Sequence, residues 1–299
     1  MPFTSVTAYG AIVAARLRAE LVTKNGVIFN EDYQGEAATA AAVAIPRLGE
    51  ATVGNYNKTS IGSNSVGYDS NEYIIATIDN DKFVNEYIDK RNLRTVKYDE
   101  IAQKLDSAGY KLAEVVDSTG LQTLINAAQG KNKAGSTYPS TDPRYQEAGV
   151  ATTATTDFYA DILATKKALR KNKANPEYCI VDPEGEAAIF DTNSKVIREG
   201  DLSQKLIEDG VIGKINGLYV FSSNNMPNTV DSTPKGVKAI ISGKRYATRV
   251  MAWVEEPATF DGNSDANVVG GVFVKGRLVF THEVTQPKAV GIVTYTLSA

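Results

Sequence analysis

The stretch GVIGKINGLYV, residues 210–220, says more about the fold than any other part of the chain. Three glycines, Gly210, Gly213 and Gly217, interrupt a run of apolar residues. Glycine adopts the positive φ angles that tight turns require, so we expect these three glycines to mark turns between short elements. The apolar side chains between them would pack beneath the turns. They are Ile212, Ile215 and Val220.

The C-terminal half around this stretch reads as a series of short strands. Residues such as Val, Ile, Tyr, Phe and Thr gather in separate runs, which is typical of strands. Regular helices do not alternate with these runs, so the pattern favours an α+β fold over a doubly wound parallel sheet. A helix with a basic last turn is expected before them, over residues 157–172. The runs are 177–182, 218–223, 236–242, 247–256, 268–284 and 289–298.

A long amphipathic helix is predicted over Tyr98–Ala128, because apolar residues recur there at intervals of three or four. At a rise of about 1.5 Å per residue, such a helix would span roughly 46 Å. Gly109 and Gly120 would each weaken it by about 1 kcal/mol relative to alanine. A helix of this length predicts an elongated, plate-like molecule.

Residues 37–78 are expected to form a long projecting hairpin. Its arms, Ala40–Leu48 and Tyr73–Ile78, carry β-forming residues, while Gly49–Ser70 is rich in Gly, Asn and Ser. Such a loop has little core of its own, so it is either a surface insertion or an arm ordered by a neighbouring subunit. We favour the arm. Its candidate contacts with a neighbour are Tyr56, Asn57, Lys58, Ile61 and Tyr68.

A short amphipathic helix is predicted near the N-terminus, over Tyr9–Val22. Its apolar stripe is narrow and could dock on its own domain or on a neighbouring subunit. Ile12 and Leu17 are the candidate contacts in the second case. The N-terminal sequence does not resemble a secretory signal, and no window is apolar enough for a membrane span.

The sequence offers little to an enzyme. His282 is the single histidine and Cys179 the single cysteine, and both lie in apolar runs, so neither a histidine-based triad nor a zinc site is predicted. Residues 130–137, GKNKAGST, hold two glycines of a phosphate-binding loop but place serine where lysine is required. A pair of carboxylates acting as acid and base stays open as a remote alternative. We therefore expect no catalytic residue, no cofactor and no metal.

The formal net charge of −3 argues against a protein that grips nucleic acid through its phosphates. Such binding needs a face dominated by basic side chains. A protein that only encloses DNA has no such need.

The order of these features resembles that of the major capsid proteins of tailed bacteriophages, which have the Hong Kong 97 fold. The stretch at 210–220, with the residues that follow it, is similar to the family's GxIGxIxGxxVxxS signature. Residues 161–169 and 175–183 also resemble a helix, a proline-bearing turn and a strand of that family. The residues after position 220 that belong to the signature region are Ser222, Ser223, Asn224 and Pro227.

The resemblance implies a division of the chain into four parts. Residues 1–36 would be an N-terminal arm and residues 37–78 the extended loop. Residues 79–131 and 251–299 would form a peripheral domain containing the long helix, called the spine helix. Residues 132–250 would form the axial domain.

The resemblance also implies a structural role and not an enzymatic one. Copies of the chain would form hexamers and pentamers that close into an icosahedral shell around phage double-stranded DNA, held without sequence-specific binding. The protein would be part of the virion capsid, assembled in the host cytoplasm. Its further partners would be a portal and either a separate scaffolding protein or none, and it would contact no membrane. An encapsulin-like nanocompartment shell, which shares the fold, is the alternative.

Overall fold

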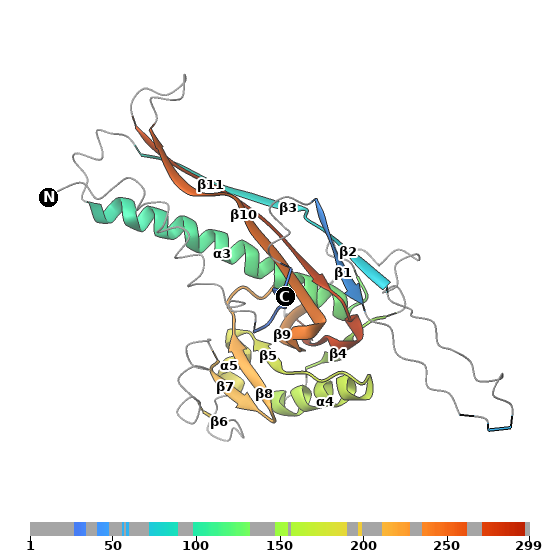
Figure 1. The fold of residues 1–299 in the computed structure, drawn as a ribbon. Helices are drawn as coiled ribbons and strands as arrows, with labels where there is room; N and C mark the ends of the chain where they lie inside the picture. Colours follow the sequence, from blue (N-terminus) through green and yellow to red (C-terminus); the bar gives the residue numbers. More distant parts are fainter. Residues whose placement is uncertain are drawn as a thin grey trace.

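The structure of the chain is a computed structural model that describes residues 27–33, 41–47, 56, 58–59, 72–88, 98–131, 147–154, 157–189, 197–198, 211–227, 235–261 and 271–296. Within these ranges the strands form three sheets, of two, three and seven strands. The described part of the molecule is elongated, as the long helix predicted (Figure 1).

A helix lying along a narrow sheet forms the long part of the molecule (Figure 1). Helix α3, Tyr98–Ala128, has the predicted bounds. The sheet has the order β10-β11-β3, and both pairs of neighbours are antiparallel. Its strands are β3 (Asn80–Ile88), β10 (Ala247–Asp261) and β11 (Val272–Val284).

The apolar face of α3 packs on one face of this sheet. Successive side chains of a strand point to opposite faces, so alternate residues of β11 face the helix. Helix α3 and strands β3 and β11 share one hydrophobic cluster. Burying each large apolar side chain of such a cluster stabilises the fold by about 1.5–3 kcal/mol. The cluster contains Val84, Leu105, Leu112, Ala113, Val116, Val274, Leu278 and Phe280.

The seven-stranded sheet forms the second large body, with strand order β4-β12-β9-β5-β8-β7-β6. Helices α4 (Phe158–Lys171) and α5 (Pro183–Ile189) pack beside it. The helix predicted over 157–172 is confirmed as α4, with the Asp157 side chain accepting from the Ala160 N–H as an N-cap. The strands are β4 (Val150–Thr153), β5 (Tyr178–Val181), β6 (Ile197–Arg198), β7 (Gly213–Ile215), β8 (Leu218–Ser222), β9 (Lys235–Ser242) and β12 (Gly291–Thr296).

The last strand does not lie where the expected division of the chain put it. Residues 251–299 were assigned to the body that contains α3, but β12 pairs with β9 and β4 in the seven-stranded sheet. The 3-10 helix η7, Pro287–Ala289, separates β11 from β12. Proline at its start cannot continue the backbone pairing of β11, so the chain leaves one sheet here and enters the other.

The glycine-marked stretch contains one tight turn within the residues described. Asn216 and Gly217 connect β7 to β8 with φ angles of 42° and 83°, the combination that short hairpin turns require. Gly213 was expected at a turn, but it is the first residue of β7 and pairs with both Arg198 and Val220. Gly210 lies outside the described residues.

The predicted hairpin arms are confirmed as strands β1 (Ala42–Arg47) and β2 (Glu72–Thr77). They pair antiparallel, with Ala42 opposite Thr77 and Arg47 opposite Glu72. Residues 79–94, where aromatic and charged side chains follow no clear period, contain strand β3.

Residues 27–33 belong to the subunit's own core, although the sequence placed them in an N-terminal arm. Ile28 and Phe29 are fully buried. The Asn30 N–H donates to the Ala247 carbonyl at 2.8 Å, and its own carbonyl accepts from the Arg249 N–H at 2.9 Å. Residues 27–33 are therefore anchored at the start of β10.

Candidate assembly surfaces

The hairpin carries the clearest exposed apolar surface. One of its faces is buried on the body of the subunit, through Val43, Ile45, Ile74 and Ala76. The opposite face points to solvent, and there the exposed fractions of Tyr73 and Ile75 are 66% and 67%. The remaining side chains of this outer hairpin face are small or apolar. They are Ala42, Ala44, Pro46 and Thr77.

Sequence reasoning placed the contacts of the hairpin at its tip and missed this outer face. The signal was present, because Tyr73–Ala76 is apolar at every position. A strand with one solvated face alternates apolar and polar residues, whereas a strand covered on both faces does not. The outer hairpin face therefore has the composition of a surface that becomes covered.

The expected tip contacts are described only in part. Tyr56 is 69% exposed, and Lys58 and Thr59 are exposed as well. The short blue segment of residues 58–59 stands apart from the sheets (Figure 1). Asn57, Ile61, Tyr68, Ile12 and Leu17 lie outside the described residues.

A second apolar group lies on the face of the three-stranded sheet that α3 does not cover. The rings of Tyr87 and Phe273 are 5.1 Å apart, and Phe260 is the partner of Phe273 on β10. Phe83 of the edge strand β3 is 75% exposed. Aromatic side chains with this much exposure are enriched at protein interfaces.

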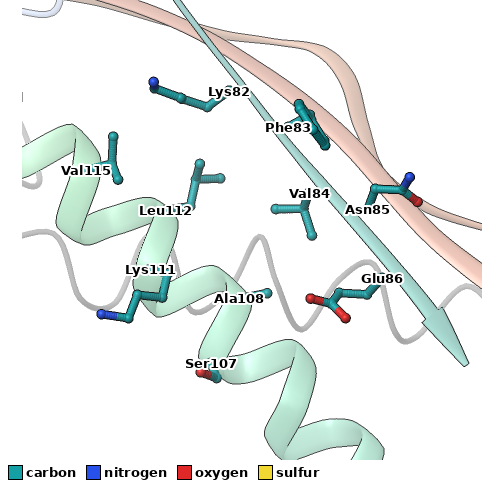
Figure 2. Close-up of a pocket in the computed structure, with 10 residues that line it drawn as sticks. All are labelled: Lys82, Phe83, Val84, Asn85, Glu86, Ser107, Ala108, Lys111, Leu112 and Val115. Carbon is teal, nitrogen blue, oxygen red and sulfur yellow. The ribbon is translucent and has the colours of Figure 1, made fainter.

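A groove of about 650 Å³ runs between β3 and α3. Figure 2 shows Val84, Ala108 and Leu112 facing one another across it, whereas Phe83 projects from the other side of the strand. Charged side chains border this apolar floor. The residues on the border are Lys82, Glu86 and Lys111.

A second hollow, of about 750 Å³, lies further along α3 against the loop after β8. Ser118 and Thr119 donate their hydroxyl hydrogens to the same carbonyl, that of Val115, at 3.2 and 2.8 Å. These hydroxyls are therefore bound within the helix. The loop residues are Asn224, Asn225, Met226 and Pro227.

The two side chains most suited to nucleophilic catalysis are enclosed. His282 is fully buried, with its ring 4.9 Å from that of Phe29 and 5.8 Å from that of Phe280. Cys179 is also buried, and loss of hydration raises the pKa of its thiol to about 12. A thiol with such a pKa is a poor nucleophile at neutral pH.

The described residues contain no group of three His, Cys, Asp or Glu side chains that could hold a metal ion. Asp182 is buried at the start of α5, where it accepts a hydrogen bond from the Gly185 N–H at 2.7 Å. Burial raises the pKa of its carboxyl group. In the part of the chain that is described, no helix is long and apolar enough to cross a membrane.

Comparison with known families shows which class of protein the chain belongs to. Residues 86–293, well over half of the chain, match a family described as phage capsid protein. The chain belongs to this phage capsid protein family. It is a structural protein of a capsid shell, a protein that assembles with copies of itself.

Solved structures show that the fold is that of tailed-phage capsid proteins. A structure from Mycobacterium phage Che8 matches 98% of this capsid protein with a TM-score of 0.61 and 17% identity, over 93% of its own chain. The capsid structure of cyanophage P-SCSP1u matches 92% with a TM-score of 0.61 and 15% identity, over 88% of its own chain. No curated protein sequence matches this chain significantly.

A virus-like particle from Pyrococcus furiosus is less similar. Its TM-score is 0.51 at 11% identity, with 96% of this capsid protein and 97% of that chain covered. The family match favours a phage capsid over the encapsulin-like alternative.

Proposed function

We propose that the chain is the major capsid subunit of a tailed phage, and that its copies form hexamers and pentamers of an icosahedral shell around double-stranded DNA. The observation that carries the proposal is the outer hairpin face, which exposes Tyr73 and Ile75 on a hairpin whose other face is already buried. A subunit that overlaps its neighbours needs such a surface. Each contact is weak, but a subunit with several neighbours accumulates buried area.

The subunit contacts in this proposal extend beyond the hairpin strands. The tip residues Tyr56, Asn57, Lys58, Ile61 and Tyr68 would reach a neighbouring subunit, because the tip has no core of its own. Ile12 and Leu17 of the N-terminal helix would dock on a neighbour too. Residues 27–33 support this role, since they fix the point on the body from which an arm would start.

The four-part division of the chain enters the proposal with three changes. The N-terminal arm would end before residue 27, the peripheral domain would resume at residue 247 so that it contains all of β10, and β12 would join the axial domain with β4 to β9. The hairpin of residues 37–78, the spine helix α3 and the sheet β10-β11-β3 keep their assigned roles. Strand pairing supports this version, because each sheet then lies within one domain.

The remaining partners follow from the same proposal. The DNA would be enclosed without sequence-specific binding, which agrees with a net charge of −3. A separate scaffolding protein would guide assembly, a portal would occupy one vertex, and assembly would take place in the host cytoplasm. The protein would carry out no catalysis, and its buried histidine and cysteine agree with that role.

Size-exclusion chromatography and negative-stain imaging of the purified full chain test the proposal. We expect closed particles, or capsomer-sized oligomers that form particles as the concentration rises. Subunits that stay monomeric at high concentration would overturn it. An enzyme cargo inside the particles would instead favour the encapsulin-like alternative.

A further inference from the structure

We propose that an ion pair between Arg47 and Glu147, with Lys288 beside it, fixes the hairpin to the subunit body at the end of its strands nearest the tip. This pair is called the latch, and that end of the hairpin is called the outer end. Arg47 is the last residue of β1, where the chain leaves the hairpin strands toward the tip. One nitrogen of its guanidinium group donates to both carboxylate oxygens of Glu147, at 2.6 and 2.7 Å. Glu147 leads into β4 of the seven-stranded sheet. The pair thus joins two separate sheets.

The environment makes this pair stronger than an ordinary surface ion pair. The side chains of Arg47 and Glu147 are only 17% and 14% exposed. Charges that are shielded from water attract one another more strongly. Because both side chains remain partly exposed, a high salt concentration still weakens this attraction. Lys288 adds a second cation, with its Nζ 3.2 Å from Glu147 Oε1. One carboxylate therefore holds two cations.

The backbone next to Glu147 is closely packed. Gly149 lies so close to its surroundings that a Cβ there would be 2.2 Å from the Val290 carbonyl oxygen and 2.7 Å from the Ala128 Cα. The end of α3, the helix η7 and the start of β12 therefore meet around Gly149. Glu147 stands two residues before this junction, and Lys288 belongs to η7 itself. The latch therefore couples the position of the hairpin to that of the subunit body.

The inner end of the hairpin is held in a different way. Val43 packs against Val250 of β10 in an apolar cluster. The Ile78 N–H also donates to the Ala41 carbonyl at 3.0 Å. Ile45 and Ile74 extend this apolar attachment toward the outer end, where the ion pair adds an ionic attachment that responds differently to salt. Loss of the latch would loosen the outer end of the hairpin and leave its inner end in place. The direction in which the chain leaves the hairpin strands toward the tip therefore depends on the latch.

Hydrogen exchange of the unassembled full chain tests this inference with the variant Glu147→Gln. We expect amide exchange in residues 44–47 and 72–74 to rise about five- to tenfold, and exchange in residues 41–43 and 76–77 to change less than about twofold. Salt of about 1 M should raise exchange at the outer end of the wild-type hairpin and have little further effect in the variant.

Asp81→Asn is the control, because it removes a more exposed Arg–carboxylate pair, with Arg277, that joins β3 to β11 and includes no hairpin residue. Unchanged exchange at the outer end in Glu147→Gln would overturn the latch. An equal rise along the whole hairpin and in α3 would also overturn it, because that result describes general destabilisation. If the variant does not fold, the salt series on the wild type decides. These outcomes do not depend on whether the hairpin contacts a neighbouring subunit.

Discussion

Gly120 of the spine helix α3 lies directly against the imidazole of His282 on β11. A Cβ at position 120 would be 3.0 Å from His282 Nε2 and 3.2 Å from Phe29 Cε2. The helix, the sheet and the N-terminal segment of residues 27–33 therefore meet at a position where a methyl group would require the neighbouring rings to shift by a few tenths of an ångström. The glycine that weakens the helix locally is what allows its close approach to the sheet.

Replacement of this glycine should destabilise the subunit, although alanine is the better helix former. The helical gain of Gly120→Ala is about 1 kcal/mol, but the added methyl group overpacks a filled site at a cost of about 1–3 kcal/mol. We expect a net loss of about 1 kcal/mol in the free energy of unfolding, measured by urea denaturation of unassembled subunits. In a His282→Ala background, Gly120→Ala should cost less, because the added methyl group can fill the vacated space. An equal cost in both backgrounds would contradict this packing explanation.

Asp182 should make the subunit less stable as the pH rises. Burial raises the pKa of its carboxyl group above the ordinary value of 3.8, the hydrogen bond from Gly185 opposes this shift, and Glu184 adds to it. The folded state therefore binds the proton more tightly than the unfolded chain. The contribution of Asp182 to stability is complete below about pH 4 and is lost as the pH rises through the raised pKa.

The variant Asp182→Asn tests this prediction, because asparagine accepts the same hydrogen bond without a charge. We expect the variant to be at least as stable as the wild type at neutral pH and to lose this advantage toward pH 4, as followed by thermal unfolding over that range. Glu177→Gln is a suitable control at a less buried carboxylate on the same body. A variant that is less stable than the wild type at neutral pH would show that the charge of Asp182 is stabilising.

Cys179 should be unreactive in the folded subunit. Its thiol is buried between β8 and β9, and its pKa of about 12 leaves almost no thiolate at pH about 8. We expect no alkylation of the native protein over hours and one rapid alkylation per chain in guanidinium chloride, as counted by mass spectrometry. Fast labelling of the native protein would mean that the seven-stranded sheet opens locally.

The sequence predicted those elements whose own residues decide their structure. Helix α3 has its predicted bounds because its apolar residues keep one helical face over the whole of Tyr98–Ala128. Strand β3 could not be assigned, because Phe83 and Tyr87 are mixed with charged residues that follow no clear period. Its structure depends on pairing with β11, which lies about two hundred residues further along the chain.

The candidate surfaces depend still more on distant residues. The sequence indicates part of the outer hairpin face, because every residue of Tyr73–Ala76 is apolar. Only the structure shows which side of the hairpin is already covered. The Arg47–Glu147 pair joins residues one hundred positions apart, and no local pattern marks either of them as a partner of the other. The tip and N-terminal contacts remain predictions.

Ile75 should matter for assembly and little for folding. Its side chain is 67% exposed in the subunit, so Ile75→Asn removes almost no buried apolar surface and should change the free energy of unfolding by less than about 0.5 kcal/mol. In a shell that covers the outer hairpin face, the same change would place an amide in an apolar contact at a cost of about 1–3 kcal/mol for each copy.

We therefore expect Ile75→Asn to raise the concentration needed for assembly by roughly tenfold, as measured by light scattering and negative-stain imaging. Val254→Asn is the control, because Val254 is a β-branched residue that is 42% exposed and belongs to β10 and not to the hairpin. Since a shell multiplies each contact by many copies, even a small cost at residue 75 should separate the two variants. Equal assembly of both would remove the outer hairpin face from the interface and leave the tip residues as the contacts to test.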